Sequence, residues 1–222
     1  MPLKLLPATE SSAARIAQIE RAAYADKPMN DVLFPGPFPP SVLDGMLDGR
    51  AANLAKELRE DPTCHWLKVI DPDIIPSFAT ESADGYHDEQ IIGFAQWNIR
   101  ANGEPLPPGR AFSGPGVNDE ACEALFGGIH RMRERVVGDR KHVHLRLCFV
   151  DPKGQRRGAG KLLVMWGVEE AARLGLPAFL EASEEGYHLY RSCGFRDVEK
   201  LVVDCKKWGV DDAVTVAMVK EP

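Results

Sequence analysis

Apolar and polar positions follow their clearest pattern in the C-terminal half of the chain. Residues 142–150 (HVHLRLCFV) and 178–181 have the pattern of strands, whereas residues 158–174 place apolar side chains at helical spacing. Gly175 and Pro177 follow that helix and mark its end. The other elements predicted here are a helix, a turn, a short helix and two strands, at residues 119–137, 151–157, 184–192, 195–203 and 213–219.

The N-terminal half is less regular. Residues 28–40 and 101–118 are rich in proline and are predicted as loops, and residues 71–89 are predicted as an irregular insertion. Loops of this length in a compact domain are commonly functional or disordered. The regular elements predicted here are strands at residues 3–7, 65–70 and 90–100, and helices from Thr9 or Ser11 to about residue 26 and over residues 41–60.

Strands that alternate with helices predict an α/β domain with a mixed sheet. The chain has 222 residues, of which 44% are hydrophobic, so it is long and apolar enough to bury one large core. We therefore expect residues 1–222 to form a single domain.

Composition and charge argue against several classes of protein. No apolar run reaches the ~18 residues of a transmembrane helix, and the apolar start of the chain is too short for a signal peptide, so a cytoplasmic protein without membrane contact is expected. The five cysteines are scattered and form no C-x-x-C pair, which predicts neither disulfides nor a metal site. A formal net charge of −6 disfavours nucleic acid and mildly favours a cationic acceptor.

The strand predicted over residues 142–150 has two contrasting faces. Because side chains alternate along a strand, strict alternation gives one wholly apolar face and one face with histidines and an arginine. Such side chains rarely lie buried without partners, so the second face is predicted to be either a solvated sheet face or a polar active-site cleft. The apolar face would hold Val143, Leu145, Leu147 and Phe149, and the other face His142, His144, Arg146, Cys148 and Val150.

A glycine-rich, cationic loop joins this strand to the next helix, with the sequence VDPKGQRRGAGK at residues 150–161. Gly158 and Gly160 lack side chains where the helix begins, so backbone N–H groups can approach an anion closely. The helix dipole adds positive charge there, as do the cationic side chains of the loop. This chemistry suits a pyrophosphate, although a glycine-rich turn with solvated arginines has the same sequence. The spacing matches neither a Walker loop nor a dinucleotide-binding G-x-G-x-x-G.

The Q-x-x-G-x-G of residues 155–160, after a strand ending in V-x-P, resembles the acetyl-CoA-binding motif of the GNAT superfamily of N-acetyltransferases. Two later stretches agree, FLEAS at 179–183 and LYRSCGF at 189–195, and the first is similar to puromycin-type acetyltransferases and fungal relatives. The resemblance covers about residues 90–219. It implies a GNAT-like mixed sheet of about six or seven strands with helices on both faces, in which the fourth and fifth strands splay apart.

The resemblance also implies where acetyl-CoA binds as co-substrate. Backbone groups of Cys148, Phe149 and Val150 would pair with the pantetheine like an added strand, and an N–H near Cys148 would polarise the thioester carbonyl. The pyrophosphate would lie on the amides at the start of the helix. The remaining cofactor-binding candidates are Gln155, Arg156, Arg157, Gly158, Ala159, Gly160, Lys161 and Ser183.

Catalytic roles follow from the same resemblance. Tyr190, in the LY…GF pattern, is the candidate general acid for the departing CoA thiolate, and a core tyrosine with a satisfied hydroxyl is the alternative. His144 is the candidate general base, at a position where histone-type members carry glutamate. It would lie about 13 Å from Cys148 along one face of the strand. Glu181 is the rival base, and a wet sheet face with no single base is the third possibility.

The expected acceptor is a primary amine of a small molecule, because the long loops suggest an enclosed pocket and the FLEAS element resembles small-molecule enzymes. Phe34, Phe38 and Trp97 are the candidate acceptor-binding residues, in or beside the two long loops. The alternatives are another acyl donor, protein or peptide N-acetylation, or an acyl-CoA-binding sensor or scaffold without catalysis. A monomer or a homodimer is compatible with the sequence.

Overall fold

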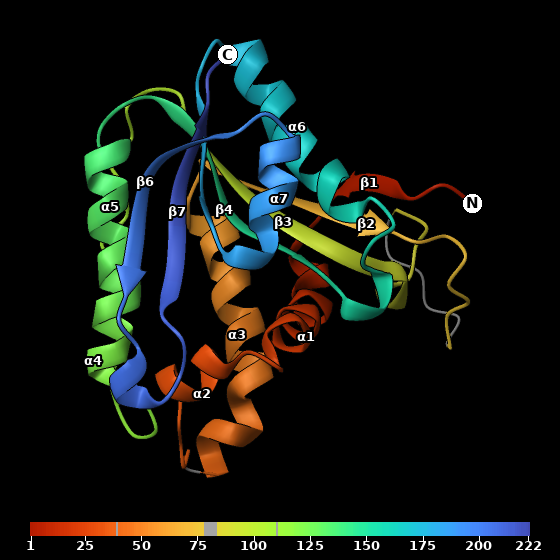
Figure 1. Ribbon diagram of the computed structural model, residues 1–222. Helices are drawn as coiled ribbons and strands as arrows, with labels where there is room; N and C mark the ends of the chain where they lie inside the picture. Colours follow the sequence, from red (N-terminus) through yellow and green to blue (C-terminus); the bar gives the residue numbers. More distant parts are fainter. Residues whose placement is uncertain (39, 78–83, 110) are drawn as a thin grey trace.

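The computed structural model of the chain describes residues 1–38, 40–77, 84–109 and 111–222. Within these residues seven strands form one mixed sheet, in which β4 and β5 are parallel neighbours and every other pair of neighbours is antiparallel (Figure 1). The expected α/β mixed sheet is confirmed. In spatial order the strands are β1 (Lys4–Pro7), β2 (Cys64–Ile70), β3 (Ile91–Arg100), β4 (His142–Val150), β5 (Ala178–Ala182), β7 (Ala213–Lys220) and β6 (Arg196–Val203).

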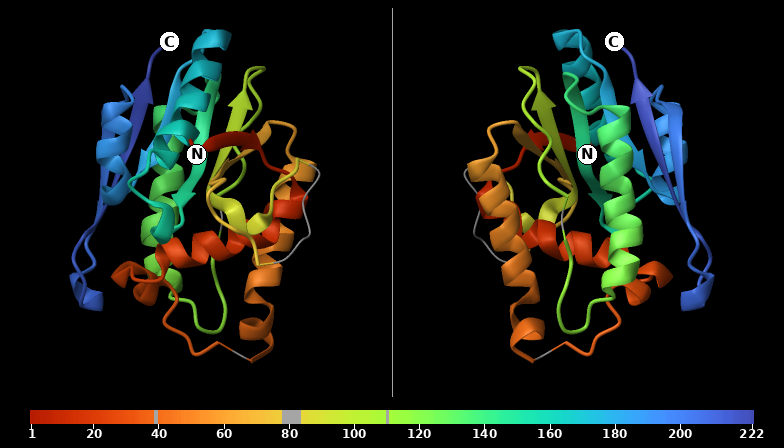
Figure 2. Two further views of the ribbon diagram at one scale, coloured as in Figure 1. Left: turned by 90° about the vertical axis from the view of Figure 1, so that its right-hand side faces the viewer. Right: turned by 90° about the vertical axis from the view of Figure 1, so that its left-hand side faces the viewer.

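Helices cover both faces of the sheet (Figure 2). α6 and α7 pack on one face, against Trp97 and Leu180 among others, whereas α1, α3 and α5 pack on the opposite face, against residues such as Phe94 and Phe179. A π-helical turn at Glu123–Gly127 joins α4 to α5. The helices are α1 (Ala13–Tyr24), α2 (Pro28–Leu33), α3 (Pro40–Glu60), α4 (Asp119–Cys122), α5 (Gly128–Val136), α6 (Ala159–Leu174) and α7 (Glu184–Ser192).

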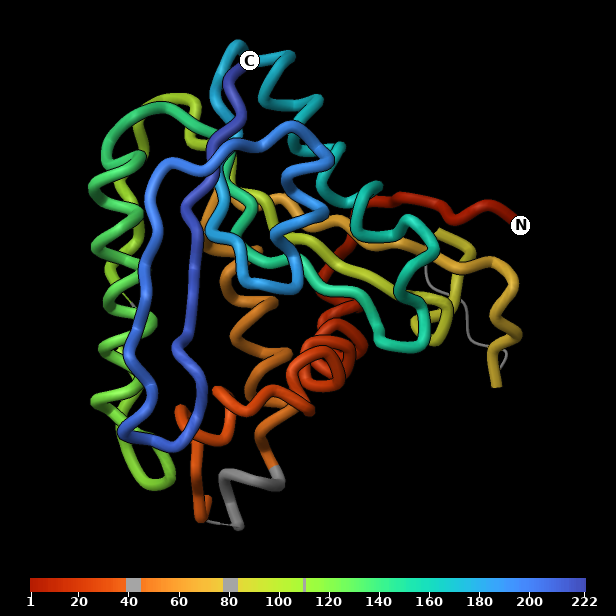
Figure 3. The backbone as a smooth tube through the Cα atoms, in the orientation of Figure 1, coloured from red at the N-terminus to blue at the C-terminus, as the bar shows by residue number. Residues whose placement is uncertain are grey.

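The predicted loop at residues 28–40 contains the short helix α2, so that prediction was wrong over its first half. Pro28 occupies the first turn of α2, where a missing N–H costs no hydrogen bond, and Val32 and Leu33 are buried against α4. The described part of residues 101–118 has no regular element and runs alongside α5 from β3 to the start of α4 (Figure 3). Residues 78–83 of the predicted insertion, and residues 39 and 110 of the predicted loops, lie outside the described residues.

One extra residue in β4 interrupts its pairing with β3. Gln96 pairs with Leu147 and Trp97 pairs with Leu145, so that Arg146 forms a β-bulge. The bulge reverses the alternation of side chains, and Cys148 therefore packs with Leu145 in the core beneath α6. Phe149 lies on the opposite face, in the core beneath α1 and α3. The predicted single apolar face was wrong, and His144 and Cys148 do not share a face.

The parallel pairing of β4 with β5 is short. It joins Val143 to Ala178 and ends with Leu145 opposite Leu180. Beyond these residues the two strands separate, which confirms the expected splay of the fourth and fifth strands. Arg146 and Glu181 are the first residues past the last pair, so they stand at the point where the strands part.

Trp97 ties the middle of the sheet to α6. Its side chain has no exposed surface, and its indole Nε1 donates a hydrogen bond to the carbonyl oxygen of Leu163 at 3.1 Å. A Cβ atom at Gly167 would lie 2.2 Å from the indole ring. The ring can therefore occupy its place only because residue 167 has no side chain.

We predict that Gly167→Ala destabilises the protein by about 1–3 kcal/mol, because the added methyl group overpacks the core. Gly49→Ala is the matched control, since Gly49 lies on an exposed part of α3 and an added Cβ meets nothing within 4 Å. The control should stabilise by up to about 1 kcal/mol through helix propensity. Urea denaturation of both variants measures the difference, and equal effects would contradict the proposed role of Gly167.

Candidate functional site

The loop after β4 is held in place by hydrogen bonds and a buried glycine. The Asp151 carboxylate accepts the N–H of Lys153 at 3.0 Å and pairs with Arg15 of α1 at 2.8 Å. Gly154 is buried, and a Cβ atom there would lie 3.0 Å from Ile92. These contacts fix the path of the chain from β4 into α6.

The end of this loop leaves open space in front of α6. Arg156 and Gly158 both adopt positive φ, at 62° and 91°, and a Cβ at Gly158 would meet nothing within 4 Å. Two of the polar side chains are engaged within the fold, because Gln155 donates to the Val150 carbonyl at 3.2 Å and Arg157 pairs with Asp71. Arg156 and Lys161 are exposed beside the N-terminus of α6. The arrangement can bind an anion through backbone N–H groups and the helix dipole.

Tyr190 of α7 lies on the α6 side of the sheet, near the parting of β4 and β5. Its ring is buried and packs against Gly186, where a Cβ atom would lie 2.6 Å from the ring. Burial, and then the charge of a Cys148 thiolate, raise the pKa of Tyr190 well above its ordinary value. Burial raises the pKa of Cys148 to about 12. Both groups are therefore protonated at neutral pH, so Tyr190 can donate a proton and Cys148 is unsuited to act as a nucleophile.

Tyr24 at the end of α1 is a further candidate site residue that the sequence did not indicate. It is 48% exposed, yet burial, followed by Glu20 and Cys148, raises its pKa. The interactions with Cys148 and with Tyr190 indicate that Tyr24 lies near these two side chains. The only signal in the sequence was an aromatic residue at the end of a helix, before a proline-rich segment. Lys27, three residues later, pairs with Glu185 of α7. This ion pair links the segment after α1 to α7, near the gap between β4 and β5.

His144 and Glu181 form a buried pair on the face covered by α5. The His144 Nε2 atom lies 2.9 Å from Glu181 Oε2, and Arg133 of α5 places its Nε atom 2.6 Å from Glu181 Oε1. Burial lowers the pKa of His144 to about 4, against the opposing effect of Glu181. Burial raises the pKa of Glu181, but the hydrogen bonds and charges of its two partners outweigh that effect and hold it below its usual range. At neutral pH His144 is neutral and Glu181 is ionised.

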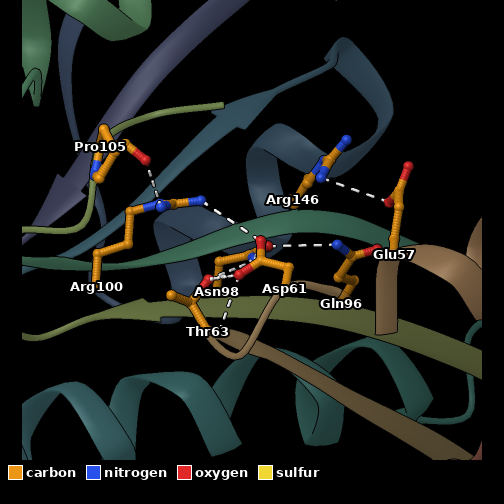
Figure 4. Close-up of polar contacts among 8 residues, drawn as sticks. All are labelled: Glu57, Asp61, Thr63, Gln96, Asn98, Arg100, Pro105 and Arg146. Carbon is orange, nitrogen blue, oxygen red and sulfur yellow. Dashed lines mark hydrogen bonds and ion pairs between the residues drawn. The ribbon is translucent and has the colours of Figure 1, made fainter. Parts of the chain in front are cut away.

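A second polar network lies on the same face (Figure 4). Asp61 accepts hydrogen bonds from Asn98 at 2.9 Å and from Thr63 at 2.6 Å, and it pairs with Arg100 at 3.7 Å. Arg100 also donates to the carbonyl oxygen of Pro105 at 2.7 Å, so residues of the 101–118 connection cover the network. Arg146, the bulge residue, pairs with Glu57 of α3 at 3.5 Å. The face that was predicted to be solvated or a cleft is, at this end, a partly buried polar layer with Thr63, Asn98 and Arg100 at its buried centre.

The two proline-rich segments are in contact at Phe34 and Phe38. The Phe38 ring lies against Gly116, where a Cβ atom would be 2.8 Å from it. Phe34 contacts Phe112 with ring centroids 5.8 Å apart, and the N–H of Gly36 donates to the Gly116 carbonyl at 3.1 Å. Trp97 lies apart from both phenylalanines, in the core beneath α6. A hollow of about 350 Å³ adjoins the meeting point. Its lining residues are Pro28, Asp31, Val32, Pro35, Asn118, Trp208 and Val210.

The described residues contain no group of three or more histidine, cysteine, aspartate or glutamate side chains arranged to hold a metal ion. No helix in the same part of the chain is long and apolar enough to span a bilayer.

Comparison with known proteins identifies the family of the chain. The family model described as "Acetyltransferase (GNAT) family" matches residues 51–195. A curated relative, described as a probable acyltransferase, SID5, of Ajellomyces capsulatus, is 25% identical over 107 residues, which cover 48% of this chain and 72% of the relative.

Two solved structures share the fold over the whole chain. The structure described as histone acetyltransferase HPA2 and related acetyltransferase, from Corynebacterium glutamicum, has a TM-score of 0.59 and 20% identity, covering 100% of this chain and 97% of its own. The yncA protein of Salmonella typhimurium, solved with its cofactor acetyl-CoA, has a TM-score of 0.55 and 15% identity, covering 100% and 94%. At these identities the likeness shows the fold alone.

Proposed function

Because the chain belongs to the acetyltransferase (GNAT) family, we propose that this acetyl-CoA-dependent enzyme acetylates a primary amine of a small molecule. The observation that carries the proposal is the open N-terminus of α6 beside the parting of β4 and β5. An anion-binding helix end and a gap in the sheet suit the two halves of CoA, a pyrophosphate and an extended chain of amides.

In this proposal the pantetheine lies between the parted strands and pairs with the backbone of Cys148, Phe149 and Val150. The pyrophosphate rests on the amides of residues 157–161, with Gln155, Arg156 and Ser183 nearby. Arg156 and Lys161 supply positive charge, because both are exposed at this end of α6. The Arg157 side chain is ion-paired with Asp71, so its role is to hold the loop in place.

The proposed chemistry is a direct transfer. The amine nitrogen attacks the thioester carbonyl and forms the N–C bond while His144 takes one proton from the nitrogen, directly or through water. The C–S bond then breaks, and the departing thiolate takes the proton of the Tyr190 hydroxyl. Buffer restores both groups to their starting protonation. The acceptor approaches from the face of α1, α3 and α5, because Glu181 and His144 lie on that side.

We further propose that residues 1–222 work as one cytoplasmic domain, as a monomer or a homodimer, without nucleic acid or membrane partners. The single seven-stranded sheet supports the single domain, because it contains the first strand along the chain, β1, and the last, β7, in one layer.

A thiol-release assay tests the function. Purified protein with acetyl-CoA should release CoA in the presence of one or more small primary amines and form the matching amide, identified by mass spectrometry. Lysine peptides and peptides with free N-termini form a second arm of the panel. Better turnover of the peptides would replace the small-molecule acceptor with a protein acceptor. Binding of acetyl-CoA without any turnover would favour a sensor or scaffold.

We predict that acetyl-CoA raises the Tm of the wild type by linkage, and that Gly158→Asp and Gly160→Asp lose this shift. The added carboxylate blocks the approach to the helix end and repels the phosphates. Gly175→Asp is the matched control, because Gly175 has a similar positive φ of 65° at the other end of α6. Thermal unfolding with and without acetyl-CoA separates lost binding from the backbone strain that Gly158→Asp shares with the control. Gly160 has no positive φ, and a Cβ atom there would lie 3.0 Å from Leu189. Equal shifts in all four proteins would rule out the loop.

We predict that Tyr190→Phe lowers kcat by about 10²-fold and leaves the affinity for acetyl-CoA nearly unchanged. The substitution keeps the ring against Gly186 and removes the proton donor. Tyr187→Phe on the same helix is the control, since its hydroxyl is bonded to Asp197 at 2.8 Å on the surface and its loss should leave kcat intact. A fully active Tyr190→Phe enzyme would exclude the hydroxyl as the general acid.

A further inference from the structure

Arg133, Glu181 and His144 form a buried chain of hydrogen bonds. Of the three, only His144 has a role in the proposed transfer chemistry. The Glu181 side chain is 9% exposed and the His144 side chain 4% exposed, and Arg133 is 16% exposed. Each oxygen of the Glu181 carboxylate has its own partner, Arg133 Nε at 2.6 Å and His144 Nε2 at 2.9 Å. Both partners are held at hydrogen-bond distance, so the carboxylate cannot rotate without breaking one of the two bonds.

The contact with Glu181 determines the tautomer of His144. An ionised carboxylate only accepts hydrogen bonds, so the hydrogen in this contact belongs to His144 Nε2. A neutral imidazole carries one hydrogen, and Nδ1 is then left with its lone pair. Nδ1 is therefore the atom of this side chain that can take a proton.

We propose that Arg133 and Glu181 are positioning residues for acetyl transfer, which hold neutral His144 with its hydrogen on Nε2 and keep Nδ1 ready to accept the proton of the acceptor amine. This inference rests on the proposed function, because it concerns the base of that reaction. Arg133 belongs to no motif of the sequence, and it reaches Glu181 from a helix 48 residues earlier in the chain.

The charges around His144 come from several elements. β5 contributes Glu181, α5 contributes Arg133, and β4 contributes His142 and the bulge residue Arg146, which is paired with Glu57 of α3. β3 contributes the neutral Asn98 directly opposite His144, with Arg100 two pairs further along, opposite His142. Removing Glu181 takes away the negative charge nearest to the imidazole, and removing Arg133 takes away a positive one.

The two removals therefore act on the pKa of His144 in opposite directions. Without the Arg133 charge, protonation of His144 meets less repulsion, so Arg133→Met should raise the pKa of His144. Without the Glu181 charge, protonation loses its compensating partner, so Glu181→Gln should lower the pKa further. A purely structural loosening of the site would expose His144 to water and move its pKa in one direction, upward, in both variants.

NMR of ¹⁵N-histidine-labelled protein measures the tautomer and the titration directly, with His144→Gln used to assign the signal. Wild-type His144 should be neutral and protonated on Nε2 from pH 5 to 8. Arg133→Met should titrate at higher pH than the wild type, Glu181→Gln should not titrate above the wild-type midpoint, and Arg133→Lys, which keeps the charge, should stay near the wild type. Arg135→Met is the matched control, because Arg135 on the same helix pairs with Glu199 at the surface.

Kinetics with an amine that the wild type acetylates complete the test. Glu181→Gln and His144→Gln should each lower kcat by about 10²-fold, and Arg133→Met by about 10-fold. Arg133→Lys should recover most of the loss, while the acetyl-CoA-induced rise in Tm remains in every variant. A hydrogen on Nδ1 in the wild type, equal pKa shifts in Arg133→Met and Glu181→Gln, or full activity of His144→Gln would overturn the proposal. A wild-type protein that acetylates no amine would instead overturn the proposed function. The NMR measurement of the His144 tautomer does not depend on turnover, so the two failures can be distinguished.

Discussion

The extra residue in β4 is the constraint on which the rest of the site depends. A strand that pairs in strict register on both sides presents each side chain to one fixed face. The bulge at Arg146 breaks that register at the point where the pairing with β5 also ends. As a result, the alternation of side chains is reversed after Arg146, so that Leu145 and Cys148 share the face of α6 while Phe149 lies on the opposite face. The side chains of Cys148 and His144 therefore lie on opposite faces of the sheet, on either side of the bulge.

The polar layer beneath α3, α5 and the 101–118 connection places several charged side chains wholly or partly away from water, and each of them has a partner of opposite charge. Three arginines, Arg100, Arg133 and Arg146, are buried or partly buried there, and each is paired with a carboxylate, Asp61, Glu181 and Glu57 respectively. An unpaired buried charge would be strongly destabilising, whereas a pair with additional hydrogen bonds is tolerated. The network also fixes geometry, because each carboxylate joins segments that are distant in sequence.

Local patterns were enough to predict much of the fold. Residues 142–150 and 184–192 form the strand and helix that their periodicity indicates, with the same limits, and the glycine-rich motif lies where a strand meets a helix. The bulge could not be predicted, because it arises from the pairing of two strands and no residue type marks Arg146. The burial of His144 depends on Arg133 and Glu181, which approach it only in the folded chain. Pro28 was read as a loop residue, although proline is equally suited to the first turn of a helix.

The ion pair between Lys27 and Glu185 has a different character from the buried pairs. Its side chains are 37% and 56% exposed, and it bridges the turn after α1 and the first turn of α7. Such a surface contact contributes about 1 kcal/mol or less, and mobile ions screen charges beyond about 8 Å at physiological ionic strength. The two sides of the opening are thus joined by a contact that thermal energy breaks readily. Higher ionic strength should therefore weaken the contact between the turn after α1 and the start of α7, whereas the buried ion pairs are screened much less.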